Sequence, residues 1–257
     1  MKKVMFAVLS VAIIASGAWA KTGFYAAKKG MVLTTITINA KGQARYLRST
    51  VTDVQGKGGN MVITSINEPL GPDRMPLDMV NPFEMTVNIV DGAVELVDGT
   101  NALTQAFPDA KWDISFSGDK MYTPANMKPG DKFRDLHMAT TMSADLGELL
   151  RSSGAEIPEE MGSGIIRVDA KVVVTGYQCL AIEKIKVPAG TFKAYKTTKT
   201  NETAMTMSGL PGVPSGTQNT TTTTVTWSVK GIGTVRRHIY DADGKLSSAM
   251  ELLEIKR

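Results

Sequence analysis

Few side chains in this sequence of 257 residues suit acid–base or nucleophilic chemistry, since it holds two histidines and one cysteine. His137 stands beside no nucleophile motif. His238 is predicted to share a solvated strand face with Arg236 and Tyr240, because side chains alternate along a strand. Catalytic groups can assemble from distant positions, but there is no Gly-x-Ser-x-Gly elbow, phosphate-binding glycine loop or His-Glu helix motif. We therefore expect no catalytic residue and no enzyme.

The single cysteine, Cys179, lies within strand-like sequence. A lone cysteine cannot form an intramolecular disulfide, and a nucleophilic one would need a histidine held beside it. We interpret Cys179 as a buried structural thiol.

Two patterns are reminiscent of metal sites. Asp241-Ala242-Asp243-Gly244 has the Asp-x-Asp-Gly order of a calcium loop, but it lacks the further carboxylates and the distal glutamate of a complete loop. A hairpin turn explains it better. The 15 methionines could bind Cu(I), although the histidines and cysteines that usually complete a copper site are scarce. We expect neither a metal nor a cofactor.

Methionine is better explained by packing. Met205 and Met207 fall on one face of a predicted strand, as do Met138 and Met142 on another. Thioether side chains fill irregular apolar space and adapt to varied ligands. In a sheet with few aromatic residues, these positions predict a deformable hydrophobic surface that could hold a lipid or another hydrophobic small molecule.

The N-terminus has the pattern of a secretion signal. Lys2 and Lys3 precede a nearly continuous apolar run over residues 4–14, and Ala18-Trp19-Ala20 places small residues at the positions read by signal peptidase. We expect a signal peptide over residues 1–20, with cleavage between Ala20 and Lys21. An uncleaved anchor is the alternative, but the apolar run is shorter than the ~20 residues that span a bilayer. The mature protein is then periplasmic or secreted.

The rest of the composition is that of an ordinary globular domain, with 42% hydrophobic and 21% charged residues. No later stretch is long and apolar enough for a transmembrane helix. Without Lys2 and Lys3, 27 basic residues face 25 acidic ones, so the formal charge falls from +4 to +2. A near-neutral chain gives no support for a nucleic-acid partner.

Alternating apolar residues and turn-forming residues predict a succession of strands. We expect them at 32–38, 45–54, 61–66, 83–90, 93–97, 111–117, 133–142, 165–175, 177–187, 192–205, 220–229, 234–240 and 245–255. At most one short helix is expected, at 144–151. Short connections between successive strands indicate an all-β, antiparallel meander that forms a strongly curved sheet or a partly closed barrel. Residues 21–257 would form this single domain.

One segment, residues 207–218, is rich in glycine and proline and is predicted to be a mobile loop. It would join a strand that ends near Met205 to one that begins near Thr220. Leu210 and Val213 are among its few apolar residues, and they could fold down as a lid over a hydrophobic ligand.

The C-terminal third resembles a known family. Val187-Pro188-Ala189-Gly190-Thr191-Phe192 and Gly231-Ile232-Gly233-Thr234-Val235 are similar to segments of the TapB-like proteins. These are uncharacterised bacterial envelope proteins related to the domain-of-unknown-function 3108 group. The resemblance implies an exported β-sheet protein with no established activity. Physically, Pro188, Gly190 and Gly244 suit turns, because proline fixes φ and glycine tolerates positive φ.

Two functions remain open at this point. The first is a non-enzymatic protein that binds a hydrophobic ligand or lipid on a methionine-rich concave face. The second is an envelope interaction or assembly factor that docks another protein through an edge strand or hairpin.

Overall fold

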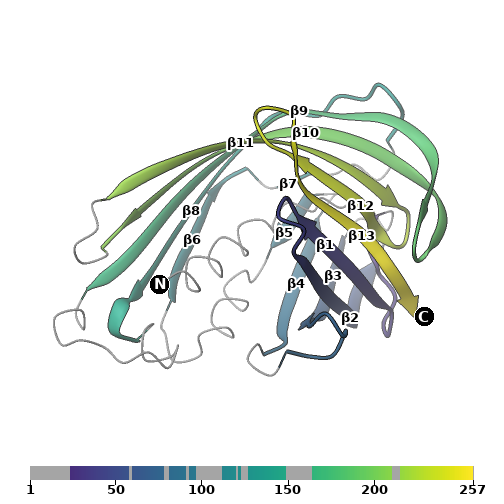
Figure 1. Ribbon diagram of the computed structural model, residues 1–257, viewed down its shortest axis with the longest axis horizontal. Coiled ribbons are helices and arrows are strands. Elements are labelled where there is room, and N and C mark those ends of the chain that lie inside the picture. Colours follow the sequence, from purple (N-terminus) through teal and green to yellow (C-terminus); the bar gives the residue numbers. More distant parts are fainter. Residues whose placement is uncertain are drawn as a thin grey trace.

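A computed structural model describes residues 24–57, 60–77, 81–90, 93–96, 112–119, 121–122, 127–148, 164–209 and 215–256. The proposed cleavage site and residues Leu210 and Val213 lie outside these ranges. Within them the chain forms one antiparallel sheet of 13 strands (Figure 1).

The first seven strands are β1 (Val32–Asn39), β2 (Ala44–Lys57), β3 (Asn60–Leu70), β4 (Phe83–Val90), β5 (Ala93–Leu96), β6 (Trp112–Gly118) and β7 (Met121–Tyr122). The other six are β8 (Leu136–Asp145), β9 (Ile165–Val187), β10 (Gly190–Ser208), β11 (Gly216–Val229), β12 (Gly233–Tyr240) and β13 (Leu246–Lys256). The all-β prediction is therefore confirmed.

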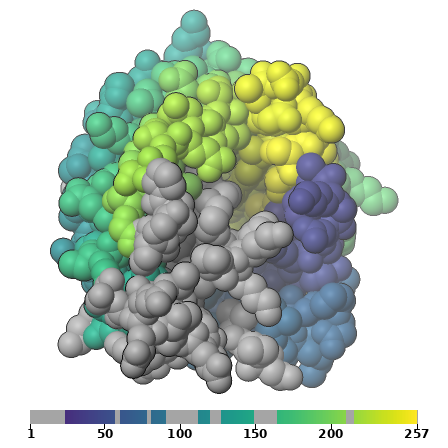
Figure 2. All heavy atoms as spheres, turned by 60° about the vertical axis from the view of Figure 1, so that its left-hand side comes forward, coloured from purple at the N-terminus to yellow at the C-terminus, as the bar shows by residue number. Residues whose placement is uncertain are grey.

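Most strands pair with their neighbours in sequence, in the order β6-β8-β9-β10-β11-β12-β13-β1-β2-β3-β4-β5-β7. β13 pairs with β1, which joins the two halves of the meander. Figure 2 shows the same succession from teal through green, yellow and purple to blue. β6 and β7 are the two edges, although β6 ends at Gly118 and β7 begins at Met121. Among the described strands β6 and β7 do not pair with each other, so the sheet is bent but open.

The strand boundaries differ from the expectation in three places. β9 is one continuous strand, because Gly176 takes a positive φ of 60° and the register shift beside it absorbs the irregularity. β10 continues to Ser208 and β11 begins at Gly216, so their ladder extends well into the expected loop. β8 runs from Leu136 to Asp145 instead of over 133–142, and the described residues 146–148 that follow it are helical, within the short helix expected at 144–151.

Turn glycines define the hairpins on either side of the central strands. β9 and β10 are joined through Pro188 and Ala189, and Gly190 follows with φ of 140°. Gly244 takes φ of 77° between β12 and β13, where Asp241 Oδ1 accepts hydrogen bonds from the backbone N–H groups of Asp243 and Lys245. The Asp-x-Asp-Gly segment is thus a hairpin turn.

Buried apolar side chains of the described residues pack in several clusters. One covers β2, β3 and β4 and includes Met31, Val51, Ile63 and Ile89. A second surrounds Trp227 and Leu252, where the tip of the β9–β10 hairpin lies against β13 and Ala189 N–H donates to Leu252 O. A third packs Phe24 and Met127 around Cys179.

Candidate functional site

The β-sheet register brings the four methionines singled out in the sequence onto one face. Met142 of β8 lies opposite Val168 of β9, which lies opposite Met207 of β10. The next cross-strand pairs on the same face are Met205 with Ala170 and Met138 with Val172. No register shift interrupts the pairing of β8, β9 and β10 over these residues. We call this set the methionine face: Met138, Met142, Val168, Ala170, Val172, Met205 and Met207.

The methionine face is apolar and well covered at its centre. Met142, Val168 and Ala170 are buried, whereas Met205 and Met207 are half-buried. The face continues onto edge strand β6 at Phe116, which lies opposite Thr140 and is 56% exposed. A gradient from buried to exposed apolar side chains therefore runs from β9 toward the sheet edge.

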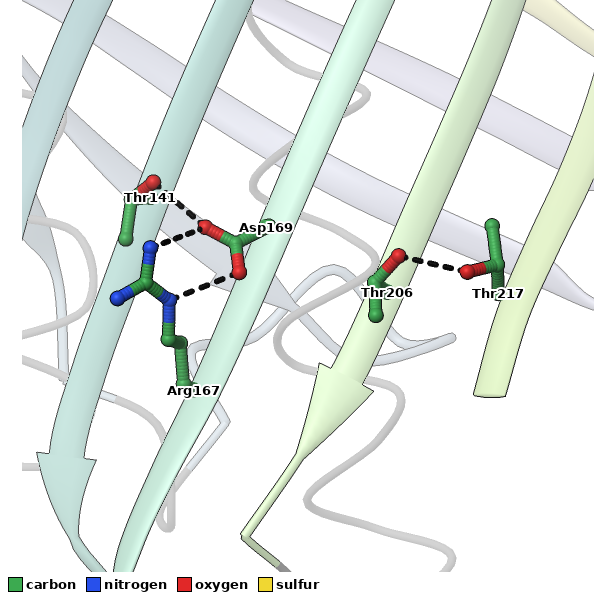
Figure 3. Close-up of polar contacts among 5 residues, drawn as sticks. All are labelled: Thr141, Arg167, Asp169, Thr206 and Thr217. Atoms are coloured by element: carbon green, nitrogen blue, oxygen red, sulfur yellow. Dashed lines mark hydrogen bonds and ion pairs between the residues drawn. The ribbon is translucent and has the colours of Figure 1, made fainter. Parts of the chain in front are cut away.

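The reverse face of the same strands carries the polar contacts that Figure 3 shows. Arg167 and Asp169 form an ion pair with Nε and Oδ2 2.8 Å apart, and Thr141 Oγ1 donates to Asp169 Oδ1 at 2.7 Å. These hydrogen bonds hold the pKa of Asp169 at about 2. On β10 and β11 the hydroxyls of Thr206 and Thr217 are hydrogen-bonded at 2.8 Å. Period-two alternation thus places the methionines on one face and these polar contacts on the other.

Two cationic residues lie farther along the apolar side. Lys199 lies an even number of residues from Met205 and Met207 along β10, so its side chain is on the same face of the strand. It lies opposite Thr224 of β11. Arg237 of β12 lies opposite Thr226, two residues along β11 from Thr224. Residues with this spacing share a face, so the register places both cations on the side that carries the methionines. We call Lys199 and Arg237 the basic end of the methionine face.

Burial dominates the electrostatics of the basic end. Lys199 is only 6% exposed, and its burial together with the nearby positive charge of Arg237 lowers its pKa to about 8. Burial also lowers the pKa of Arg237. Arg237 Nε is buried and has no hydrogen-bond partner among the residues that the structure describes. Such a group is costly to bury, which makes it a candidate for binding something else.

The sequence pattern found the methionines but missed Lys199 and Arg237. Lys199 could have been found by extending the alternation of Met207 and Met205 back along β10. Arg237 could not, because its face depends on how β12 is registered against β11, where a shift follows Trp227. Pro188 and Gly190 belong to the hairpin at the opposite end of β10 from Met205 and Met207.

The residues considered for catalysis are not brought together. His137 is exposed, and its backbone N–H donates to Asp119 Oδ2 at 2.9 Å. His238 packs edge-on against Trp227, with ring centroids 5.1 Å apart, and burial lowers its pKa. It is half-buried here, so the solvated environment expected for it is only partial.

Cys179 is free and buried, as a structural thiol would be, and burial raises its pKa. Within the described ranges, no three acidic, histidine or cysteine side chains gather closely enough to hold a metal ion. In the same ranges, no helix has the length and apolar character needed to cross a bilayer.

Comparison with known proteins places the chain in a family. Residues 28–252 match the DUF3108-like family. No curated protein matches the chain.

Two solved structures share its fold. A candidate exported protein with a YmcC-like fold from Bacteroides fragilis is 20% identical, with a TM-score of 0.56, and the match covers 91% of this chain and 99% of that one. A candidate lipoprotein from Parabacteroides distasonis is 16% identical, with the same TM-score and the same coverage. At these identities the likeness concerns the fold alone. The family match spans most of the sequence, and the chain therefore belongs to the DUF3108-like family.

Proposed function

We propose that this protein is an exported, non-enzymatic binding protein of the bacterial envelope, which holds a hydrophobic molecule such as a lipid on its methionine face. The observation that carries the proposal is the contrast between the two sides of β8, β9 and β10. Met142, Val168 and Met207 align on one side, and Thr141, Asp169 and Thr206 align on the other. Removing apolar surface from water supplies the driving force for such binding.

Methionine suits this role better than a rigid core residue would. Its unbranched side chain adapts to irregular apolar shapes, which favours contact with a flexible hydrocarbon. Met205 and Met207 are half-buried, so they keep apolar surface available for contact with a ligand.

The test uses N-phenyl-1-naphthylamine, an uncharged probe whose fluorescence rises in apolar surroundings. Met205→Glu places a charge on the methionine face, and Thr206→Glu places the same charge on the polar face one residue away. We expect Met205→Glu to weaken probe binding at least about tenfold and Thr206→Glu to leave it unchanged. Absence of binding to the unaltered protein, or equal loss in both variants, would overturn the proposal.

The envelope location rests on the N-terminal signal pattern and on the names of the structural relatives, which are candidate exported proteins or lipoproteins. We place the protein in the periplasm or outside the cell, and we retain the TapB-like assignment as part of this proposal. Edman sequencing of exported protein should begin at Lys21, and retention of Met1 would contradict the cleavage.

A second candidate function is docking of another envelope protein through the edge strand β6. The supporting observation is that β6 pairs only with β8 among the described strands and exposes Phe116. An open strand edge can accept an added strand. Under this alternative, Phe116→Ser should abolish co-elution with a partner in envelope extracts, whereas Met205→Glu should leave co-elution unchanged.

A further inference from the structure

The methionine face and its basic end form one continuous strip along β10. Met207, Met205, Thr203, Asn201 and Lys199 alternate on the same side, and the ladder between β10 and β11 has no register shift. Eight residues at ~3.4 Å per residue separate Met207 from Lys199, a span of about 27 Å. One elongated molecule could therefore touch both the apolar part and the cations.

The polarity of this strip changes in steps. Its Met207 end is flanked by Val168 of β9. Midway, Asn201 Nδ2 donates to Thr224 Oγ1 at 3.1 Å, which introduces hydrogen-bonding groups. Lys199 and Arg237 follow at the other end. This succession of apolar, polar and cationic groups matches the order of groups in an amphiphile with an acidic head.

No described carboxylate neutralises Arg237. None of the ion pairs among the described residues includes it. Glu251 of β13 lies opposite Arg236, the residue next to Arg237, and forms its ion pair with Arg236. Adjacent residues of a strand point to opposite faces, so this ion pair lies on the other face of the sheet. A positive charge and a buried donor at Arg237 Nε thus remain for a ligand.

We propose that the bound molecule is a long-chain carboxylate, whose acidic head lies between Lys199 and Arg237 and whose hydrocarbon chain extends along β10 toward Met205 and Met207. This inference rests on the proposed function, because it names the ligand class of the same face. A guanidinium donates to a carboxylate through a planar pair of N–H groups. The hydroxyls of Thr224 and Thr226, which lie between the two cations on β11, supply further hydrogen bonds.

A single negative charge fits the basic end better than two. Arg237 remains cationic at neutral pH. Lys199, buried beside Arg237, gives up its proton more readily than an exposed lysine. A carboxylate also brings only one negative charge out of water, so it costs less to bury between Lys199 and Arg237 than a phosphate monoester, which carries close to two charges.

The experiment measures displacement of N-phenyl-1-naphthylamine by three molecules with the same chain, namely palmitate, cetyl alcohol and cetyl phosphate. The variants are Arg237→Met and Lys199→Met, with Arg236→Met as the matched control on the opposite face. Circular dichroism establishes that each variant is folded, and Lys199→Met provides the test if Arg237→Met does not fold.

We expect palmitate to displace the probe more effectively than cetyl alcohol or cetyl phosphate. Arg237→Met and Lys199→Met should each weaken palmitate binding about tenfold, the loss expected for one charge-assisted hydrogen bond. Cetyl alcohol binding should be unchanged in both, and Arg236→Met should leave all three affinities unchanged.

Equal affinity for palmitate and cetyl alcohol, or an equal loss in Arg236→Met, would overturn the assignment of the basic end while leaving the hydrophobic site intact. Preference for cetyl phosphate would overturn the carboxylate head. Failure of the unaltered protein to bind the probe and all three molecules would instead overturn the proposed function itself.

Discussion

Met205 of β10 lies directly opposite Ala170 of β9, so a long thioether side chain stands beside a single methyl group. One residue farther along each strand, Thr206 lies opposite Asp169 on the other side of the sheet. The two faces therefore differ not only in polarity but also in bulk. Ala170 is buried at the centre of the methionine face, with Met205 half-buried beside it, so added bulk at Ala170 would displace the neighbouring apolar side chains.

Ala170→Trp should disturb the methionine face where the proposed ligand binds. The indole would displace neighbouring side chains such as Met205 and remove part of the apolar contact with a bound chain. We expect affinity for N-phenyl-1-naphthylamine to fall about tenfold, equivalent to the loss of roughly two buried methylene groups. Lys171→Trp adds the same bulk at an exposed position on the opposite face and serves as the control. Fluorescence titration measures both, and unchanged binding by Ala170→Trp would contradict the location of the site.

Gly190→Val tests the hairpin that joins β9 and β10. Gly190 has φ of 140°, a conformation that L residues rarely adopt, and a Cβ there would also meet the Phe192 ring at 3.5 Å. We expect the free energy of unfolding to fall by about 1–3 kcal/mol. Gly216→Ala is the control, because no heavy atom lies within 4 Å of the added Cβ. Urea denaturation compares them, and equal midpoints would show that Gly190 carries no special conformational role.

Local alternation was sufficient to predict the strands and hairpins, because each depends on neighbours in sequence. It was insufficient at positions where pairing overrides local composition. Gly176 does not interrupt β9, and Met207 pairs with Gly216 inside the expected loop. The edge pairing of β7 with β5 joins residues separated by β6, which no local pattern indicates.

The candidate site was predictable only in its apolar part. Met205 and Met207 are two residues apart, so their common face follows from the strand period alone. Bringing Arg237 to the same side as Lys199 requires knowledge of register across three strands. Register depends on bulges, whose positions the sequence does not reveal.

The pH dependence of Asp169 follows from its hydrogen bonds to Arg167 and Thr141. Its pKa falls from 3.8 to about 2, so the stabilising interaction is complete above pH 3.8 and is lost as the pH falls through about 2. In an NMR titration, Thr141→Val should move the Asp169 midpoint upward, because one donor to the carboxylate is removed. Ser143→Ala, on the same face of β8 but opposite Arg167, is the control. A midpoint at 3.8 in the unaltered protein would refute the interaction.

Lys199 should make the ligand-free protein more stable at alkaline pH. Its pKa is about 8 in the folded state against 10.5 for an exposed lysine, so between these values the unfolded chain binds more protons and stability rises with pH. The slope is at most about 1.4 kcal/mol per pH unit for one group. Urea denaturation at both ends of this window should show the rise in the unaltered protein, and Lys199→Met should lack that increment. The exposed Lys193→Met variant of the same strand should retain it. A rise that persists in Lys199→Met would assign the effect to another group and leave Lys199 as an ordinary lysine.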